Sequence, residues 1–116
     1  MNIIDCQKLV DLNDLNETFW LGYCYEYGIG VKNDEYEAFK HYNASAETGD
    51  SNGIYQVGQC YYLGIGIKKD KYKAFLHYRK SAEARNSIGI WKTAICYFYG
   101  VGVEKNIAEY YNWFKK

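Results

Sequence analysis

The stretch "CYEYGIGV", Cys24 to Val31, returns twice along the chain. It reads "CYYLGIGI" at Cys60 to Ile67 and "CYFYGVGV" at Cys96 to Val103, so each copy begins 36 residues after the one before. A fixed period between about 20 and 50 residues is typical of solenoids, in which each unit buries its apolar face only against its neighbours. The sequence therefore predicts a stack of three similar units.

Each unit contains two predicted helices. Apolar and small residues recur at the spacing of one helical face over Leu15 to Tyr27 and over Glu35 to Glu47. Gly28 follows the first helix, and glycine takes the left-handed conformation that ends a helix at low cost. Residues that cap helix N-termini occupy equivalent positions in every copy. These are Asp14, Asp50 and Asn86 before the first helices, and Asp34, Asp70 and Asn106 before the second helices. We therefore expect an all-α fold without a β-strand between Asp14 and Lys116.

Composition restricts the classes of partner. The 14 basic residues equal the 14 acidic residues, so the chain has no basic field for nucleic acid. No segment approaches the about 20 apolar residues of a membrane span, which argues against a membrane partner. The N-terminus, "MNIIDCQKLV", lacks the pattern of a signal peptide. These features predict a cytoplasmic chain.

The repeated residues resemble those of the Sel1-like repeat family, which is related to the tetratricopeptide repeat. The resemblance covers about Asp14 to Lys116, and in the first copy it rests on Leu21, Gly22, Tyr25, Gly28, Gly30, Val31, Asp34, Ala38, Tyr42, Ala46, Glu47 and Gly49. It implies a right-handed α-solenoid of helix-turn-helix repeats. The expected units are a capping helix within residues 1–13, repeats at 14–49 and 50–85, and an incomplete third repeat at 86–116. Within the capping unit, residues 4–12 resemble a worn second helix.

Each copy departs from the family pattern at some position. His41 and His77 stand where the family usually has tryptophan, which Trp113 keeps. Tyr110 replaces a small alanine, and the copy stops inside its second helix. We therefore expect Trp113 and its aromatic neighbours to lie uncovered at the C-terminal end, where they would favour self-association or belong to a longer array.

The four cysteines are expected to be free. Cys24, Cys60 and Cys96 lie on equivalent helices, which stack at least about 8–10 Å apart. A disulfide needs Cα atoms within about 7 Å, so these cysteines should neither pair nor share a metal. Cys6 has no obvious partner, and the second cysteine per repeat of the cysteine-rich bacterial relatives is missing. Free buried thiols are typical of a reducing compartment.

No constellation of catalytic or cofactor-binding residues is apparent. His41 and His77 are 36 residues apart on equivalent helices, which favours a structural role over a zinc site. The string "GIGVKND" lacks the third glycine of a dinucleotide-binding motif and follows a helix rather than a strand. We expect no catalytic residue, no metal and no cofactor.

The exposed face of the first helices is the candidate binding site. In the related tetratricopeptide fold the first helix lines the concave groove, and its counterpart here is rich in aromatic side chains, which dominate interface hot spots. The candidate groove residues are Phe19, Tyr23, Tyr27, Tyr55, Gln59, Tyr62, Trp91, Ile95, Phe98 and Tyr99. The alternative is that several of them only pack between repeats.

The resemblance implies a non-catalytic scaffold or adaptor that binds a protein or peptide segment in this groove. Two alternatives remain. Sel1-like arrays are often joined to a kinase-like domain, so the chain would be a regulatory fragment of a longer signalling protein. Some cysteine-rich relatives have been linked to β-lactam binding or hydrolysis, but their cysteine pattern is absent here.

Overall fold

The computed structural model describes residues 5–13 and 15–115 and contains only helices over those ranges. The elements are α1 (Cys6–Leu12), the 3₁₀ helix η1 (Leu15–Glu17), α2 (Thr18–Tyr27), α3 (Glu35–Glu47), α4 (Ser51–Leu63), α5 (Lys71–Glu83), α6 (Ser87–Tyr99) and α7 (Ile107–Phe114). The all-α prediction is confirmed.

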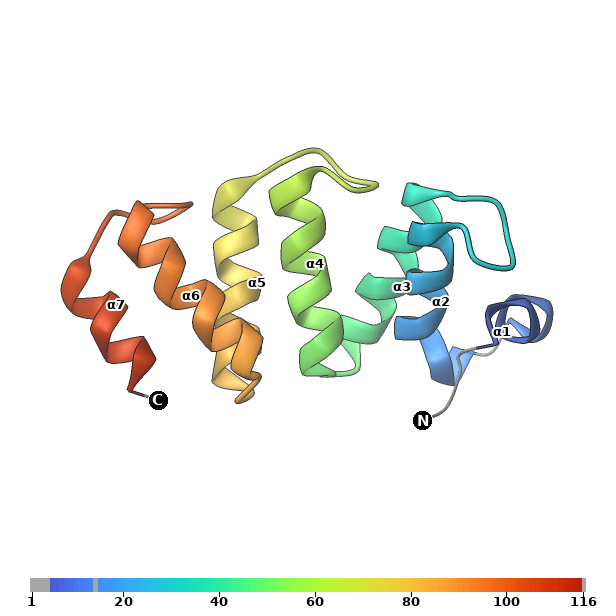
Figure 1. Ribbon diagram of the computed structural model, residues 1–116, viewed down its shortest axis with the longest axis horizontal. Helices are drawn as coiled ribbons and strands as arrows, with labels where there is room; N and C mark the ends of the chain where they lie inside the picture. Colours follow the sequence, from blue (N-terminus) through green and yellow to red (C-terminus); the bar gives the residue numbers. More distant parts are fainter. Residues whose placement is uncertain (1–4, 14, 116) are drawn as a thin grey trace.

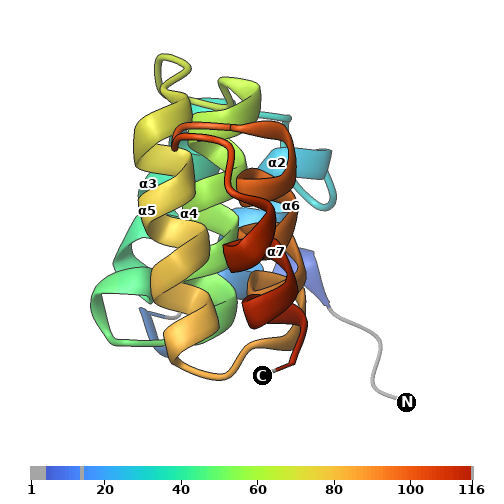
Figure 2. The ribbon, with the colours of Figure 1, turned by 90° about the vertical axis from the view of Figure 1, so that its left-hand side faces the viewer.

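The helices form an elongated stack of 48 × 30 × 22 Å (Figure 1). Helices α2 to α7 lie side by side in chain order, and each packs mainly on the helices before and after it. Figure 2 looks along this stack from the end at which α7 lies. Within the described ranges, no helix has the length and apolar character that crossing a membrane requires.

The predicted caps set the helix ends. Asp34, Asp70 and Asn106 each accept a hydrogen bond from the backbone N–H three residues later, as an N-cap does. The glycines that follow the first helices, Gly28 and its two equivalents, adopt the left-handed conformation. The expected cap at Asp14 lies outside the described residues, and α2 begins instead after η1.

The second glycine of each turn touches the preceding second helix. A β-carbon at Gly66 would overlap with the carbonyl oxygen of Glu35, at the start of α3. One at Gly102 would overlap with the equivalent oxygen of Lys71, at the start of α5. This close approach explains why the phrase "GIG" or "GVG" recurs once per unit.

The core repeats with the turns. In α3 and in α5, a buried alanine and a buried tyrosine pack in one cluster with the cysteine of the following first helix. The two central clusters consist of Ala38, Tyr42, Val57 and Cys60, and of Ala74, Phe75, Tyr78 and Cys96. Each first-helix cysteine thus faces the second helix that precedes it.

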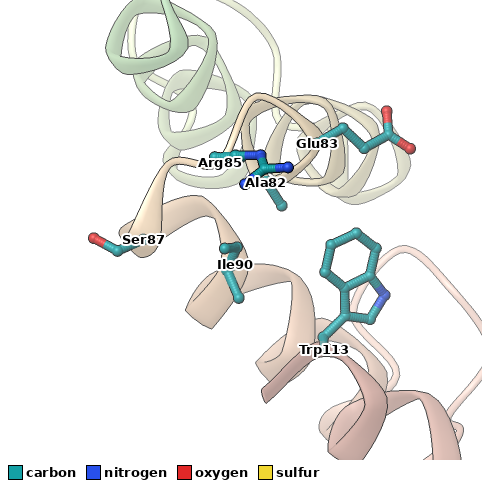
Figure 3. A pocket seen from close by; sticks show the side chains of 6 residues that line it. All are labelled: Ala82, Glu83, Arg85, Ser87, Ile90 and Trp113. Carbon is teal, nitrogen blue, oxygen red and sulfur yellow. The ribbon is translucent and has the colours of Figure 1, made fainter. Parts of the chain in front are cut away.

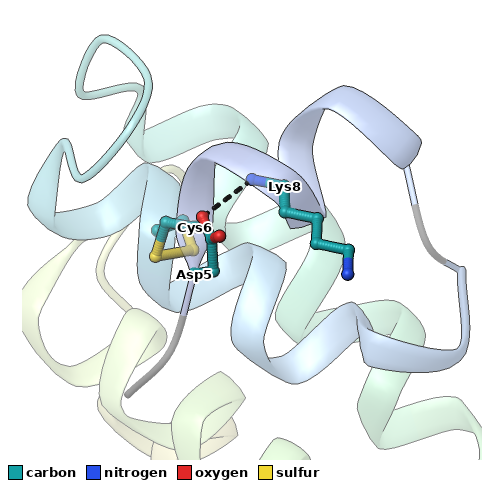
Figure 4. Close-up of a disulfide and its surroundings, with 4 residues drawn as sticks. Asp5, Cys6 and Lys8 are labelled. Carbon is teal, nitrogen blue, oxygen red and sulfur yellow. Dashed lines mark hydrogen bonds between the residues drawn. A yellow bond between two sulfur atoms is a disulfide. The ribbon is translucent and has the colours of Figure 1, made fainter.

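At the N-terminal end, α1 takes the place of a preceding second helix. A β-carbon at Gly30 would lie 2.6 Å from the backbone nitrogen of Gln7, so the first turn contacts α1 as later turns contact α3 and α5. Asp5 caps α1 by accepting a hydrogen bond from the Lys8 N–H (Figure 4). Asp5, Lys8 and Asp11 are all exposed, as expected of a capping unit.

The prediction of four free cysteines is wrong. Cys6 and Cys24 form a disulfide, with their Cα atoms 5.6 Å apart (Figure 4). Only Cys60 and Cys96 are free, and both are buried. The sequence argument excluded bonds between cysteines of equivalent first helices. The observed bond instead joins α1 to α2, which packs on it. The cytoplasmic prediction depended in part on four free thiols, and the chain has only two.

Removal of the disulfide by Cys6→Ala with Cys24→Ala is expected to lower the free energy of unfolding by about 3 kcal/mol. The bond closes a loop between cysteines 18 residues apart and so restricts the unfolded chain. Urea denaturation measures the loss, and Cys60→Ala, which removes only a packed thiol, serves as control. Thiol titration in denaturant should find two groups before reduction and four after it; four before reduction would contradict the bond.

At the C-terminal end, the expected exposure of Trp113 is also wrong. Its side chain is only 7% exposed and lies in a cluster with Ala82 and Ala94. In contrast, Tyr111 and Phe114 are 58% and 46% exposed. The last helix therefore covers one of its aromatic residues and leaves two in contact with solvent.

Candidate functional site

The first helices carry the candidate binding surface, which we call the aromatic face. It consists of the ten residues Phe19, Tyr23, Tyr27, Tyr55, Gln59, Tyr62, Trp91, Ile95, Phe98 and Tyr99. None of them is buried: Tyr27, Trp91 and Tyr99 are exposed, and the other seven are half-buried. Tyr55, Tyr62, Trp91 and Phe98 are thus at least partly exposed, whereas their position in a concave groove and their role in binding stay predictions.

The half-buried members anchor the face to the second helices. Tyr55 lies against the ring of Tyr78, with 5.7 Å between ring centroids. Gln59 accepts a hydrogen bond from the Tyr78 hydroxyl, and Phe98 lies 4.9 Å from Tyr110 of α7. These residues pack within the monomer and are only partly exposed, so the packing interpretation applies to them, whereas a role in binding stays a prediction.

The exposed members form the outer part of the face. Tyr27 lies 4.8 Å from Tyr23, and Tyr99 lies 4.8 Å from Phe98, measured between ring centroids. Trp91 is 49% exposed and has the ammonium group of Lys92 5.5 Å from its ring. Large aromatic surfaces of this kind are held in place by neighbouring rings and lose little conformational entropy on binding.

Two aromatic residues next to the face were not identified from the sequence. Trp20 lies 5.6 Å from Tyr23 and 4.9 Å from Phe19, and thereby extends the ring contacts of α2. Tyr110 of α7 joins the face through Phe98. Trp20 was missed because its helical position differs from those of the exposed set, and Tyr110 because it was expected only at the C-terminal end.

Few charges lie near the aromatic face. Glu26 is the acid on the first helices, and it accepts a hydrogen bond of 2.7 Å from the Tyr42 hydroxyl. The negative charge of Glu26 raises the pKa of Tyr27 above its ordinary value, and partial burial adds to the effect. Tyr27, which like an ordinary tyrosine is uncharged at neutral pH, can act as a hydrogen-bond donor on the face.

The helix order, the repeated turns and the repeated cores together define the family. The family model for the Sel1 repeat matches residues 18–50, 51–86 and 87–116. The chain belongs to the Sel1 repeat family. Each matched segment contains one first helix, one G-x-G turn and one second helix, so the Sel1 repeats coincide with the structural units described above.

Solved structures with the Sel1 repeat architecture are similar over most of this chain. A Sel1 repeat protein from Oxalobacter formigenes is 31% identical, with a TM-score of 0.83, over 90% of this chain and 42% of that one. The protective antigen c5321 of uropathogenic Escherichia coli, described as displaying an SLR fold, is 27% identical with a TM-score of 0.82, over 93% and 23%. This chain therefore spans less than half the length of these two proteins.

A third solved structure shows the fold alone. Helicobacter pylori cysteine rich protein B is 22% identical, with a TM-score of 0.77, over 96% of this chain and 84% of that one. No curated protein matches the chain significantly. The Sel1 repeat is thus established as fold and family, and the comparisons name no substrate or partner for this chain.

The histidines of the Sel1 repeats have structural partners. His41 Nδ1 lies 2.8 Å from the Glu37 carbonyl oxygen, and its ring stacks on Tyr25 with 5.4 Å between centroids. His77 makes the equivalent contact with the carbonyl oxygen of Lys73. Among residues 5–13 and 15–115, no three histidine, cysteine or acidic side chains are grouped closely enough to hold a metal ion.

Proposed function

We propose that this Sel1 repeat array is a non-catalytic scaffold or adaptor that holds a segment of another protein against its aromatic face. The observation that supports the proposal is that charged residues are few on the first helices of the repeats and frequent on the second helices. Helices α2, α4 and α6 contain one acid, Glu26, and one base, Lys92, whereas α3 carries four charged residues and α5 carries five. A surface that is aromatic and poor in charge has the composition of an interface core.

The three exposed rings give the expected partner its chemistry. Tyr27, Trp91 and Tyr99 offer apolar ring surface together with hydroxyl and indole N–H groups. Such residues form hot spots because they bury much area with few rotatable bonds. The matching segment is an extended or helical peptide with apolar side chains and few charges.

Replacement of Tyr27, Trp91 and Tyr99 by alanine is expected to weaken binding of such a segment by 100-fold or more, because a hot-spot residue typically contributes about 2 kcal/mol or more. Peptides selected from a displayed random library against the wild-type chain provide the ligand. Their dissociation constants are then measured against wild type and variant by isothermal titration calorimetry.

The matched control is the pair Tyr36→Ala and Tyr72→Ala. These tyrosines are 65% and 60% exposed, but they lie on the second helices α3 and α5. The control variant should keep wild-type affinity. If both variants weaken binding equally, or if neither does, the aromatic face is not the binding surface.

Self-association through the C-terminal end remains a second proposal for the same array. The exposed pair Tyr111 and Phe114 supports it, and the burial of Trp113 reduces the apolar area available.

The disulfide between Cys6 and Cys24 favours an oxidising compartment over the cytoplasm, since such bonds persist mainly outside reducing environments. Nothing in the structure favours the kinase-linked or β-lactam alternatives.

A further inference from the structure

The equal numbers of acidic and basic residues are distributed unevenly along the stack. Residues 1–49 contain nine acidic and three basic residues, a net charge of −6. Residues 50–116 contain five acidic and eleven basic residues, a net charge of +6. The first unit and the later units therefore carry opposite charge, although the chain as a whole is neutral.

The contrast is greatest where the second helices begin. The N-cap and first residues of α3 read "DEYE" at 34–37, and those of α5 read "DKYK" at 70–73. We call these segments the acidic motif and the basic motif. They occupy equivalent positions, 36 residues apart, and differ only in two glutamates that become two lysines. The third unit, with "NIAE" at 106–109, does not continue the pattern.

The first residue of each motif has a structural role, and the others lie at the surface. Asp34 and Asp70 cap their helices by accepting hydrogen bonds of 3.1 and 3.0 Å from the backbone three residues later. The remaining residues are exposed, except for the half-buried Glu37; they are Glu35, Tyr36, Glu37, Lys71, Tyr72 and Lys73. The cap therefore dictates the aspartates and not the charges that follow them.

Local structure does not explain the two lysines. The positive end of the helix dipole favours acidic residues in the first turn and disfavours basic ones. Glu35 and Glu37 therefore suit the start of α3, whereas Lys71 and Lys73 oppose the start of α5. Within residues 5–13 and 15–115 neither lysine forms an ion pair, and Lys73 lies over the Tyr61 ring, 5.6 Å from its centroid. In the described part of the chain, both lysines thus lack a partner of opposite charge.

The two motifs lie next to each other along one edge of the stack. Gly66, in the turn that leads into the basic motif, lies against the carbonyl oxygen of Glu35 in the acidic motif. Figure 1 shows the turns before α3 and α5 along the same upper edge. Lys68 and Lys69, which are exposed in the second of these turns, add positive charge beside the basic motif. No motif residue belongs to the aromatic face, so this edge is a separate surface.

The other basic residues of the second unit lie toward the opposite end of α5. Arg79 pairs with Glu83 at 3.3 Å. Arg85 lines a pocket at that end together with Trp113 (Figure 3). Arg79 and Lys80 are exposed and do not belong to the basic motif, so they provide a matched control on the same helix.

We propose that two copies of this chain associate through these motifs, with the acidic motif of one copy against the basic motif of the other. A two-fold axis between the neighbouring motifs makes this contact twice, because residue i of one copy meets residue j of the other and j meets i. Contact of like motifs would bring equal charges together, which is unfavourable. Charge therefore fixes the register of the pair.

Tyr36 and Tyr72 give this contact its apolar area. Exposed ion pairs contribute little to affinity one by one, whereas a tyrosine ring buries a large area with few rotatable bonds. Each tyrosine stands between the two like charges of its motif and thus at the centre of the contact. The expected product is a weak dimer that salt dissociates, since salt screens exposed charges.

Sedimentation equilibrium tests the pairing. The dissociation constant of the wild-type dimer should rise about 10-fold or more between about 50 and 500 mM NaCl. Glu35→Lys with Glu37→Lys makes both motifs basic, and Lys71→Glu with Lys73→Glu makes both acidic. Each variant alone should dimerise about 30-fold more weakly than wild type, because like charges then meet. Each reversal installs residues that the other motif already carries, and circular dichroism verifies that the helices remain.

The two variants should rescue each other. An equimolar mixture restores opposite charges at both contacts and should dimerise with an affinity within about 3-fold of wild type. One chain with all four substitutions should dimerise equally well. The control, Arg79→Glu with Lys80→Glu, changes the net charge as much as Lys71→Glu with Lys73→Glu does. It should leave the dissociation constant within about 3-fold of wild type.

Four results would overturn the proposal. The first is a wild-type chain that stays monomeric at about 0.5 mM protein and low salt. The second is a control that weakens the dimer as much as the motif reversals, which would assign the effect to net charge. The third is a mixture of the two reversed variants that stays monomeric. The fourth is a dimer abolished by Tyr111→Ser with Phe114→Ser and unaffected by the motif reversals, which would place the interface at the C-terminal end.

Discussion

Substitution of Gly66 by alanine should destabilise the chain by about 3–5 kcal/mol, a large part of the stability of a small domain. Gly66 has φ of 70°, a conformation that costs an alanine about 1–2 kcal/mol. Its added β-carbon would also overlap with the backbone of Glu35, which can yield only if α3 and the turn separate. Urea denaturation followed by circular dichroism measures the loss.

Gly49→Ala is the matched control for this prediction. Gly49 also has a positive φ, of 89°, but no atom lies within 4 Å of its β-carbon position. This variant should therefore lose only the conformational part, about 1–2 kcal/mol. Equal losses at the two glycines would show that contact between the turn and the preceding helix contributes nothing to stability.

The period and the helix ends could be predicted from the sequence because their causes are local. An aspartate or asparagine caps a helix through an N–H only two or three residues away, as Asp50 does for Asn52 and Asn86 for Gly89. Gly28 ends its helix through its own φ. Neither feature depends on how the repeats stack, so a single copy is enough to predict it.

The disulfide could not be predicted in the same way. The segment containing Cys6 does not follow the 36-residue period, and so the repeat gave no register for it. Its position is fixed by contact of Gly30 with Gln7, a long-range packing event. Cys6 of α1 is bonded to Cys24 of α2, whereas in the next unit Cys60 packs in a cluster with Ala38 and Tyr42 of α3.

The surroundings of Trp113 include one substitution in the third repeat. In the second repeat a β-carbon at Gly58 would lie 2.9 Å from the Tyr78 ring, so only glycine admits that ring. The equivalent residue of the third repeat is Ala94, which already has a β-carbon. The ring of Phe114, equivalent to Tyr78, is exposed, and Trp113 lies in the buried cluster with Ala82 and Ala94. The sequence shows that Ala94 replaces a glycine, but it does not show which aromatic ring packs near Ala94.

For the aromatic face, partial exposure could be predicted from the sequence, whereas the contacts of its individual side chains could not. Exposure follows from helical position, which the repeat defines. The hydrogen bond from Tyr78 to Gln59 and the contact of Phe98 with Tyr110 depend on side-chain packing between helices. Binding hot spots are therefore expected among Tyr27, Trp91 and Tyr99, which lack such structural duties.

Buried ionisable groups should make the chain sensitive to alkaline pH. Burial raises the pKa of the Cys60 thiol to about 12, and nearby Glu26 adds to the effect; burial raises the pKa of Cys96 to about 11. Burial also raises the pKa of Tyr42 and Tyr78, with a further contribution at Tyr42 from its hydrogen bond to Glu26. All four side chains are at most 3% exposed.

The sign of the effect follows from proton binding. Above about pH 8.5 for thiols and about pH 10 for tyrosines, the unfolded chain releases protons that the folded chain retains. Stability is therefore full below these values and falls as the pH rises. The two thiols alone should lower the free energy of unfolding by about 3 kcal/mol between pH 8.5 and 10, and the tyrosines should add to the loss above pH 10.

The double variant Cys60→Ala with Cys96→Ala tests this prediction. It should be somewhat less stable at pH 8 because two packed thiols are lost, but its stability should change little between pH 8.5 and 10. Urea denaturation at both pH values measures the difference, and return to pH 8 should restore the wild-type signal, which excludes exchange with the Cys6–Cys24 disulfide. An equal loss of stability in wild type and variant would mean that other groups cause the alkaline sensitivity, and that the buried thiols ionise as easily in the folded chain as in the unfolded one.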